Sequence, residues 1–261
     1  MHLSRLVLAI PLSFLAGAPA LSAAPEADPG AIDAALANPD RPAEDREQDG
    51  WRKADEVLEF LGLHPGMHVI DYFAADGYYS ELMSYVVGPE GRVVAYNNAP
   101  YLGFSGDTPA QRYANERLPN VVQVTTAPEE LALEPGSLDA ALFVWTYHDL
   151  YWQPKDERSQ AGWPVIDPEQ ALAKLVPALK PGAVVVVVDH VAPAGSDPVE
   201  TVDAAHRIDP AVIRRDFEAA GFVFDAESPV FRNPDDDHAT PVFDDAIRYR
   251  TDQVMYRFRK K

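Results

Sequence analysis

Apolar residues recur along the chain with two different periods, and the alternation of these periods predicts the fold class. Residues 41–63 show the three- and four-residue spacing of an amphipathic helix, and Pro65 and Gly66 end this pattern. Downstream, short runs rich in β-branched residues alternate with longer helical patterns. The runs that predict strands are residues 67–73, 91–97, 120–126, 138–146 and 183–190. The last run is so continuously β-branched that we expect it to be buried on both faces of a parallel sheet.

Helical patterns lie between these strands and after them, over residues 78–88, 108–118, 167–182 and 209–222. Asp167 and Asp209 are N-cap candidates because each is followed by Pro, and Pro177 should kink the helix that Asp167 begins. Residues 222–228 and 252–261 are candidate closing strands. The acidic segment PDDDH (234–238) between them is predicted to be a solvated loop. This order of elements predicts a doubly wound α/β sheet with helices on both sides.

The first residues have the composition of an export signal. Arg5 precedes an apolar run, residues 6–15, and small residues follow up to residue 24. This order predicts a signal peptide over residues 1–24, and hence a periplasmic or secreted protein. The alternative is a membrane anchor, but the run is shorter than the roughly 20 apolar residues that a span needs, and Pro11 interrupts it.

Composition and charge narrow the domain count and the classes of partner. The chain has 261 residues, of which 47% are hydrophobic, so it can bury one sizeable core but not two full enzyme domains. Residues 25–45 mix Ala, Pro and Asp and predict a flexible arm, which leaves residues 46–261 for the folded domain. A net charge of −19 argues against nucleic acids and anionic membranes as partners. The absence of Cys excludes disulfides and thiolate chemistry.

The segment VIDYFAADGYYSE (69–81) stands where doubly wound folds hold their ligand. The first strand, a glycine-rich turn and the next helix form a cradle at the carboxyl ends of the strands. Gly77 allows close packing where the helix begins, and the free N–H groups of that helix could take a carboxylate. Phe73 and Ala75 add side chains at positions where such turns use glycine. The alternative is a turn that only packs.

This segment resembles the cofactor turn of class I S-adenosylmethionine-dependent methyltransferases, in which an acidic residue is followed by glycines at every second position. Asp71 matches the acid, and Phe73, Ala75 and Gly77 stand at the glycine positions. The resemblance runs from about Arg46 to the C-terminus. More narrowly, the chain is similar to a bacterial group of such proteins, often with signal peptides, that shares segments like GYYSE, YHDLYW, HRIDP, FRNPDDDH and TDQVMYRFRKK.

The resemblance implies a seven-stranded sheet whose last strand is antiparallel, S-adenosylmethionine as cofactor, and methyl transfer to a small molecule. It places Asp71, Phe73, Ala75 and Gly77 at the cofactor. Asn97 follows the second strand, where the family places an acid on the ribose, so it would bind with one carbonyl oxygen. Aromatic residues near the same edge, Tyr147 among them, are expected to line the pocket or stack on adenine.

Histidines follow the fourth and fifth predicted strands. His148 and His190 should both lie at the ligand edge, and His206 can fold toward it. A neutral histidine can remove a proton from an attacking oxygen or nitrogen, which makes His148 the first candidate for general base and His206 the second. His and Asp residues could also bind a divalent metal, but no HxxxH or HExxH spacing supports this, and no metal site is predicted.

Other functions stay open at this stage. One is an exported, non-catalytic binding protein that retains the fold, because the turn lacks two glycines and the ribose acid. Another is a metal-dependent hydrolase or lyase on the same fold. A nicotinamide dinucleotide would instead require GxGxxG and a later acidic residue.

Overall fold

The computed structural model describes residues 23–154 and 162–261. Almost all of the predicted signal peptide, residues 1–22, lies outside the described residues, so that feature stays a prediction. Among the helices that the structure describes, none combines the length and the apolar character that crossing a membrane requires.

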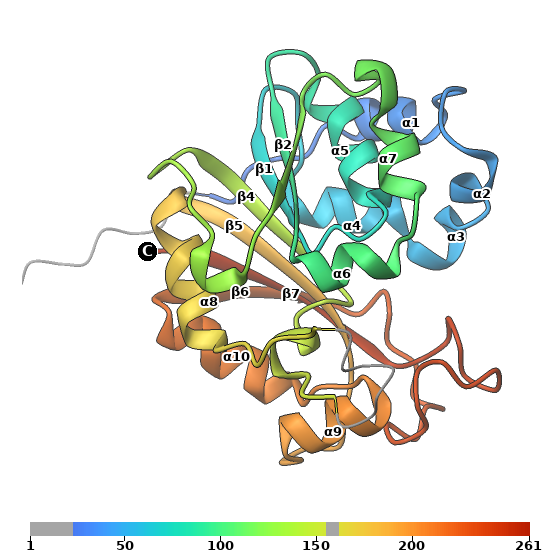
Figure 1. Ribbon diagram of the computed structural model, residues 1–261, viewed down its shortest axis with the longest axis vertical. Coiled ribbons are helices and arrows are strands. Elements are labelled where there is room, and N and C mark those ends of the chain that lie inside the picture. Colours follow the sequence, from blue (N-terminus) through green and yellow to red (C-terminus); the bar gives the residue numbers. More distant parts are fainter. Residues whose placement is uncertain (1–22, 155–161) are drawn as a thin grey trace, which may run out of the picture.

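A seven-stranded sheet forms the centre of the fold (Figure 1). Its strands are β1 (His68–Tyr72), β2 (Arg92–Asn97), β3 (Val121–Thr125), β4 (Leu138–Val144), β5 (Leu179–His190), β6 (Phe222–Ser228) and β7 (Gln253–Lys260). They lie in the order β3-β2-β1-β4-β5-β7-β6. β1 to β5 are parallel, whereas β7 is antiparallel to its neighbours β5 and β6. The predicted doubly wound sheet with an antiparallel last strand is confirmed.

Helices cover both faces of the sheet (Figure 1). They are α1 (Pro29–Leu36), α2 (Ala43–Arg46), α3 (Asp49–Arg52), α4 (Ala54–Leu61), α5 (Tyr78–Val87), α6 (Ala99–Phe104), α7 (Thr108–Arg112), α8 (Pro168–Leu175), α9 (Pro198–Ala205) and α10 (Pro210–Ala219). Short 3₁₀ turns are η1 (Ala114–Glu116), η2 (Pro128–Glu130), η3 (His148–Tyr151) and η4 (Val176–Ala178). Asp167 and Asp209 cap α8 and α10 as predicted, and α8 ends one residue before the turn that contains Pro177.

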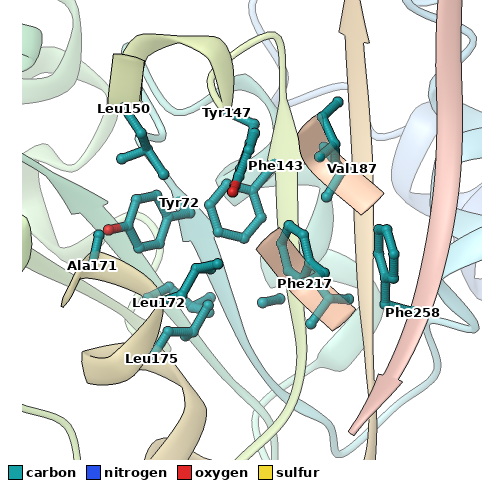
Figure 2. Close-up of a cluster of buried hydrophobic side chains, with 14 of the residues drawn as sticks. Tyr72, Phe143, Tyr147, Leu150, Ala171, Leu172, Leu175, Val187, Phe217 and Phe258 are labelled. Carbon is teal, nitrogen blue, oxygen red and sulfur yellow. The ribbon is translucent and has the colours of Figure 1, made fainter. Parts of the chain in front are cut away.

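Two apolar clusters lie on opposite faces of the sheet. Helices α1, α4 and α5 supply one cluster, and helices α8 and α10 supply the other, part of which is drawn in Figure 2. Alternate valines of β5 enter each cluster, and residues 184–188 are fully buried, as their β-branched run predicts. The sheet is therefore closed on both faces, and its carboxyl edge remains for a ligand.

The composition of residues 25–45 predicts a flexible arm, and this prediction is wrong. Helix α1 packs on α5, and the Ile32 side chain is fully buried. Arg41 is also buried and forms a bidentate pair with Asp49, at 2.7 and 2.8 Å. The Ala-, Pro- and Asp-rich composition hides these few anchoring residues, because their partners stand in later elements.

The GYYSE segment attaches this N-terminal region to the sheet. The Tyr78 hydroxyl donates to Asp49 at 2.6 Å, and the Tyr79 hydroxyl donates to the Arg52 carbonyl at 3.1 Å. Glu81 is fully buried and forms ion pairs with Arg112 and with a second arginine, Arg117. Tyr78, Tyr79 and Glu81 therefore dock the N-terminal helices against α5.

Arg112 carries the same attachment further, because it pairs with Asp45 of α2 as well as with Glu81. All three side chains are almost completely buried. A buried ion pair of this kind is strongly destabilised when one partner is removed, since the remaining charge is left without compensation.

The prediction of a solvated PDDDH loop holds for only part of that segment. Asp236 is buried and pairs with the fully buried Arg207 at 2.8 and 3.0 Å. His238 lies 2.9 Å from Asp252, which Arg232 also contacts. The loop is thereby fixed against β7.

Candidate active site

A cavity of about 690 Å³ opens at the carboxyl ends of β1, β4 and β5. This volume is in the range of small-molecule sites. Its walls come from the end of α3, the turn after β1, helix α6 and the start of α7, the ends of β4 and β5, the segments that follow β4 and α9, and the loop that precedes β7. The side chains that the argument uses are Arg52, Asp71, Phe73, Tyr101, Trp145, His148, Asp149, His190, His206 and Phe243.

The turn after β1 keeps a glycine-like backbone without most of its glycines. Phe73, Ala75 and Gly77 have φ values of 57°, 52° and 89°. The left-handed region costs a residue with a side chain about 1–2 kcal/mol. Strain at two non-glycine positions of a cavity wall indicates a geometry that the rest of the fold enforces.

Gly77 is required by packing. A Cβ at this position would lie 2.1 Å from the Tyr113 hydroxyl and 3.0 Å from Cδ of Arg112. Gly77 is the N-cap of α5, and it is not among the described residues that line the cavity, although its neighbours Asp76 and Tyr78 are. It acts by letting α5 begin close to α7.

Phe73 lines the cavity and stacks on Tyr101 of α6, with ring centroids 4.9 Å apart and planes 13° apart. Tyr101 and Asp149 line the same cavity, and burial together with the Asp149 charge raises the pKa of Tyr101 well above its ordinary value. The aromatic pair therefore closes the cavity on the side of β2, and it joins the turn to the histidine side of the site.

Asn97 does not line the cavity as a ribose-binding residue would. Its side-chain oxygen accepts a hydrogen bond from the Ala75 backbone N–H at 2.9 Å, and its amide donates to the Ala75 carbonyl at 3.4 Å. Asn97 is only 5% exposed. The predicted direct contact is wrong: Asn97 holds the left-handed turn in place.

Tyr147 also lies away from the cavity, which corrects its prediction as a cofactor residue. Tyr147 immediately precedes the 3₁₀ turn η3 and lies in the core, where Figure 2 shows it beside Phe143 and near Phe217. Its hydroxyl donates to Asp216 of α10 at 2.9 Å. The next two residues in the chain, His148 and Asp149, line the cavity instead.

Asp71 is the penultimate residue of β1, lines the cavity and is 4% exposed. The Ser80 hydroxyl donates to its Oδ2 at 2.7 Å. Burial raises the pKa of Asp71 to about 6, against the opposing effect of this hydrogen bond. Asp71 therefore lies in the cavity, and at pH 7 it is largely ionised, while its contact with a cofactor stays a prediction.

His148 is held by two carboxylates. Its Nδ1 lies 2.7 Å from Asp189, which also accepts the His148 backbone N–H at 2.9 Å, and its Nε2 lies 3.4 Å from Asp149. Burial alone would lower the pKa of His148, but the negative charges of Asp189 and Asp149 raise it to about 9. A protonated, ion-paired imidazole is poorly suited to act as a general base at pH 7.

His206 has the opposite character. Burial and the nearby His148 charge lower its pKa to about 4, so its imidazole is neutral at pH 7. It lies against His148 with ring centroids 5.6 Å apart, and it has a left-handed backbone with φ of 51° at the end of α9. His190 is also neutral, because burial lowers its pKa to about 3, and its Nδ1 lies 2.7 Å from the Thr251 hydroxyl. The site thus sets one imidazolium beside two neutral imidazoles.

Two wall residues escaped prediction from the sequence. Arg52 enters from α3 and Phe243 enters from the loop that precedes β7. Neither has a local motif, because each reaches the cavity through tertiary packing of a segment that reads as a surface helix or loop. Within residues 23–154 and 162–261, no group of three or more His, Asp or Glu side chains is arranged to hold a metal ion.

No protein-family model matches the chain, and a search of curated proteins found no match. Solved structures do resemble it. A S-adenosylmethionine-dependent methyltransferase from Aquifex aeolicus has a TM-score of 0.56 at 18% identity, over 88% of this chain and 98% of that one. The [4+2]-cyclase SpnF has a TM-score of 0.56 at 15% identity, over 92% and 99% of the two chains.

A third resemblance covers less of the other protein. Haemonchus contortus phosphoethanolamine N-methyltransferase 2, solved in complex with S-adenosyl-L-methionine, has a TM-score of 0.50 at 16% identity, over 68% of this chain and 38% of that one. At such identities a resemblance establishes the fold, and the cyclase illustrates that one fold hosts different reactions. The chain has the fold of class I S-adenosylmethionine-dependent methyltransferases.

Proposed function

We propose that this protein is an S-adenosylmethionine-dependent methyltransferase that acts on a small molecule. The observation that carries the proposal is the joining of two features in one cavity: the turn after β1 with Asp71, and the histidine group after β4, β5 and α9. In this fold the turn after β1 lies at the carboxyl ends of the strands, where ligands bind. The histidine group beside it supplies side chains that can transfer a proton.

The residues at the turn fit this cofactor. Asp71 is a buried carboxylate, which suits the ammonium and sulfonium groups of S-adenosylmethionine. Phe73 and Ala75 keep the left-handed backbone that the turn needs. Tyr101 and Phe104 supply aromatic surface on which the adenine ring of the cofactor could stack. The ribose is the exception, since Asn97 is engaged by Ala75 and does not reach the cavity. When bound, the cofactor supplies a methyl group activated by a sulfonium.

The histidine side would orient the acceptor and hold its proton. Neutral His206 is the better base in this proposal, because it can take a proton from an acceptor O–H or N–H at pH 7. His148 would donate a hydrogen bond or fix the position of His206, since Asp189 keeps it protonated. Trp152 and Phe243, both in contact with the His206 ring, would exclude water around it.

Calorimetric titration of the mature protein with S-adenosylmethionine and with S-adenosylhomocysteine tests this proposal. We expect micromolar binding of both. Asp71→Asn should weaken binding at least tenfold, whereas Asp235→Asn, a change at an exposed acid that does not line the cavity, should leave it unaltered. Absence of heat and of thermal stabilisation at millimolar concentrations of both compounds would overturn the proposal and favour a binding protein that retains only the fold.

Export is the second part of the proposal, and it rests on the signal-like composition of residues 1–24. A fusion of these residues to a reporter that is active only outside the cytoplasm should give signal. Replacing Leu8 and Leu12 with Arg should abolish the signal, because the apolar run would be interrupted. Equal reporter activity with and without residues 1–24 would contradict export.

A further inference from the structure

Arg52 is the cation of the cavity that has no acidic partner within the described chain. Its guanidinium carbon lies over the rings of Trp51, Tyr78, Tyr79 and Trp145, at 4.9, 4.3, 5.9 and 5.0 Å from their centroids. Its Nε donates to Gln48 at 2.9 Å. The aromatic rings pack against the faces of the guanidinium. Such packing is compatible with N–H groups at its edge donating two hydrogen bonds to one carboxylate.

Three buried arginines of this fold are neutralised by carboxylates. Arg41 pairs with Asp49, Arg112 pairs with Asp45 and Glu81, and Arg207 pairs with Asp236. In residues 23–154 and 162–261 no carboxylate forms a salt bridge with Arg52, although the chain has 41 acidic and 22 basic residues. A guanidinium left without a carboxylate in so acidic a chain, and facing a cavity, is suited to a carboxylate that comes from a ligand.

Asp71 presents the complementary charge in the same cavity. One of its oxygens accepts the Ser80 hydroxyl, and Asp71 forms no salt bridge with Arg52 or with another cation of the described residues. Both side chains line the same cavity. The cavity therefore offers one anion and one cation that do not neutralise each other by direct contact.

We infer that Arg52 and Asp71 together bind the zwitterionic end of an α-amino acid, with the carboxylate on Arg52 and the ammonium on Asp71. Two sources share this chemistry. One is the amino-acid end of S-adenosylmethionine, and this source rests on the proposed function. The other is a free amino acid that enters the cavity as substrate. In either case Arg52 selects ligands that carry a carboxylate.

The test compares ligands with and without the amino-acid end, in a protein that begins at Ala24. S-adenosylhomocysteine, 5′-methylthioadenosine and L-methionine are titrated calorimetrically into wild type, Arg52→Gln and Arg52→Lys. Arg214→Gln is the matched control, because Arg214 also lies over an aromatic ring, Phe224 at 4.2 Å, but on the surface of α10. Circular dichroism and thermal unfolding of each variant verify that the fold is retained.

We expect Arg52→Gln to weaken S-adenosylhomocysteine about 10- to 100-fold, the usual loss for a charged hydrogen bond, and to leave 5′-methylthioadenosine unchanged. Arg52→Lys should give an intermediate loss of affinity, since Lys keeps the positive charge but lacks the paired N–H donors that bind a carboxylate at two points. Wild-type binding of L-methionine without either nucleoside would support the inference while overturning the methyltransferase proposal. Equal affinity of wild type and Arg52→Gln for S-adenosylhomocysteine would overturn the inference alone.

Discussion

The Asn97 side-chain oxygen accepts the Ala75 backbone N–H at 2.9 Å, so a residue at the end of β2 supports the turn after β1 from outside the cavity. This contact explains how the turn keeps a left-handed backbone at Phe73 and Ala75. It also links two positions, Ala75 and Asn97, at which the resemblance predicts cofactor contacts. In this structure Asn97 supports Ala75.

Replacing Asn97 with Ala should therefore weaken the fold and the site together. The Ala75 N–H would lose its acceptor in a buried environment, which costs about 1–3 kcal/mol. We expect a lower midpoint in urea denaturation and weaker binding of S-adenosylhomocysteine, although Asn97 does not line the cavity. Thr126→Ala, at the end of the neighbouring β3, is the control and should alter neither measurement. Unchanged stability in Asn97→Ala would contradict the supporting role.

Ala75→Gly should stabilise the protein or leave its stability unchanged. Ala75 has φ of 52°, and Gly adopts this region without the penalty of about 1–2 kcal/mol that a Cβ imposes. The greater chain entropy of Gly offsets about 0.4–1 kcal/mol of that gain. The same substitution at exposed, helical Ala204 of α9 should instead cost about 1 kcal/mol. Urea denaturation of the two variants compares the signs, and a clear loss in Ala75→Gly would show that the methyl group is needed for packing.

The N-terminal helices should be part of the cooperative fold. A protein that begins at Ala24 retains α1, Arg41 and Asp45, whereas one that begins at Glu47 loses all three. The shorter protein leaves Arg112 with one of its two carboxylate partners and uncovers α5, so we expect it to lose at least about 3 kcal/mol of unfolding free energy. Urea denaturation measures this difference. Identical denaturation midpoints for the two proteins would mean that the residues before Glu47 do not contribute to the stability of the fold.

The sequence pattern predicts the sheet well, because strand periodicity and helix caps are local signals. The valines of β5, and Asp167 and Asp209 at helix starts, behave as their neighbours in the chain dictate. The same logic places Asp71 and His148 at the carboxyl edge, since topology alone brings strand ends together. Local signals together with the topology thus bring Asp71 and His148 to the site.

Direction and partnership are harder to predict. Tyr147 and His148 are adjacent, yet the η3 turn sends one into the core and the other into the cavity. Arg52 reads as an ordinary charge on a surface helix, because the rings that hold it stand up to 93 residues away in the chain, at Trp145. The protonation of His148 depends on Asp189, which joins it only through the pairing of β4 and β5. Such features require tertiary structure.

The buried pair of His148 and Asp189 should make stability depend on pH in a defined window. The folded-state pKa of His148, about 9, lies above its ordinary value of 6.5, so the folded protein binds the proton more tightly than the unfolded chain does. This contribution is complete below pH 6.5 and is lost as the pH rises through about 9. His148→Gln should therefore cost about 3 kcal/mol or more of unfolding free energy at pH 6, because Asp189 is left without its cation, and less at pH 9.5.

Urea denaturation of wild type and His148→Gln at pH 6, 7.5 and 9.5 measures the difference. His64→Gln, at a surface position between α4 and β1, is the control and should show no such trend. A cost that is the same at pH 6 and pH 9.5 would mean that His148 is neutral in the fold, and it would return His148 to the position of a candidate base beside His206.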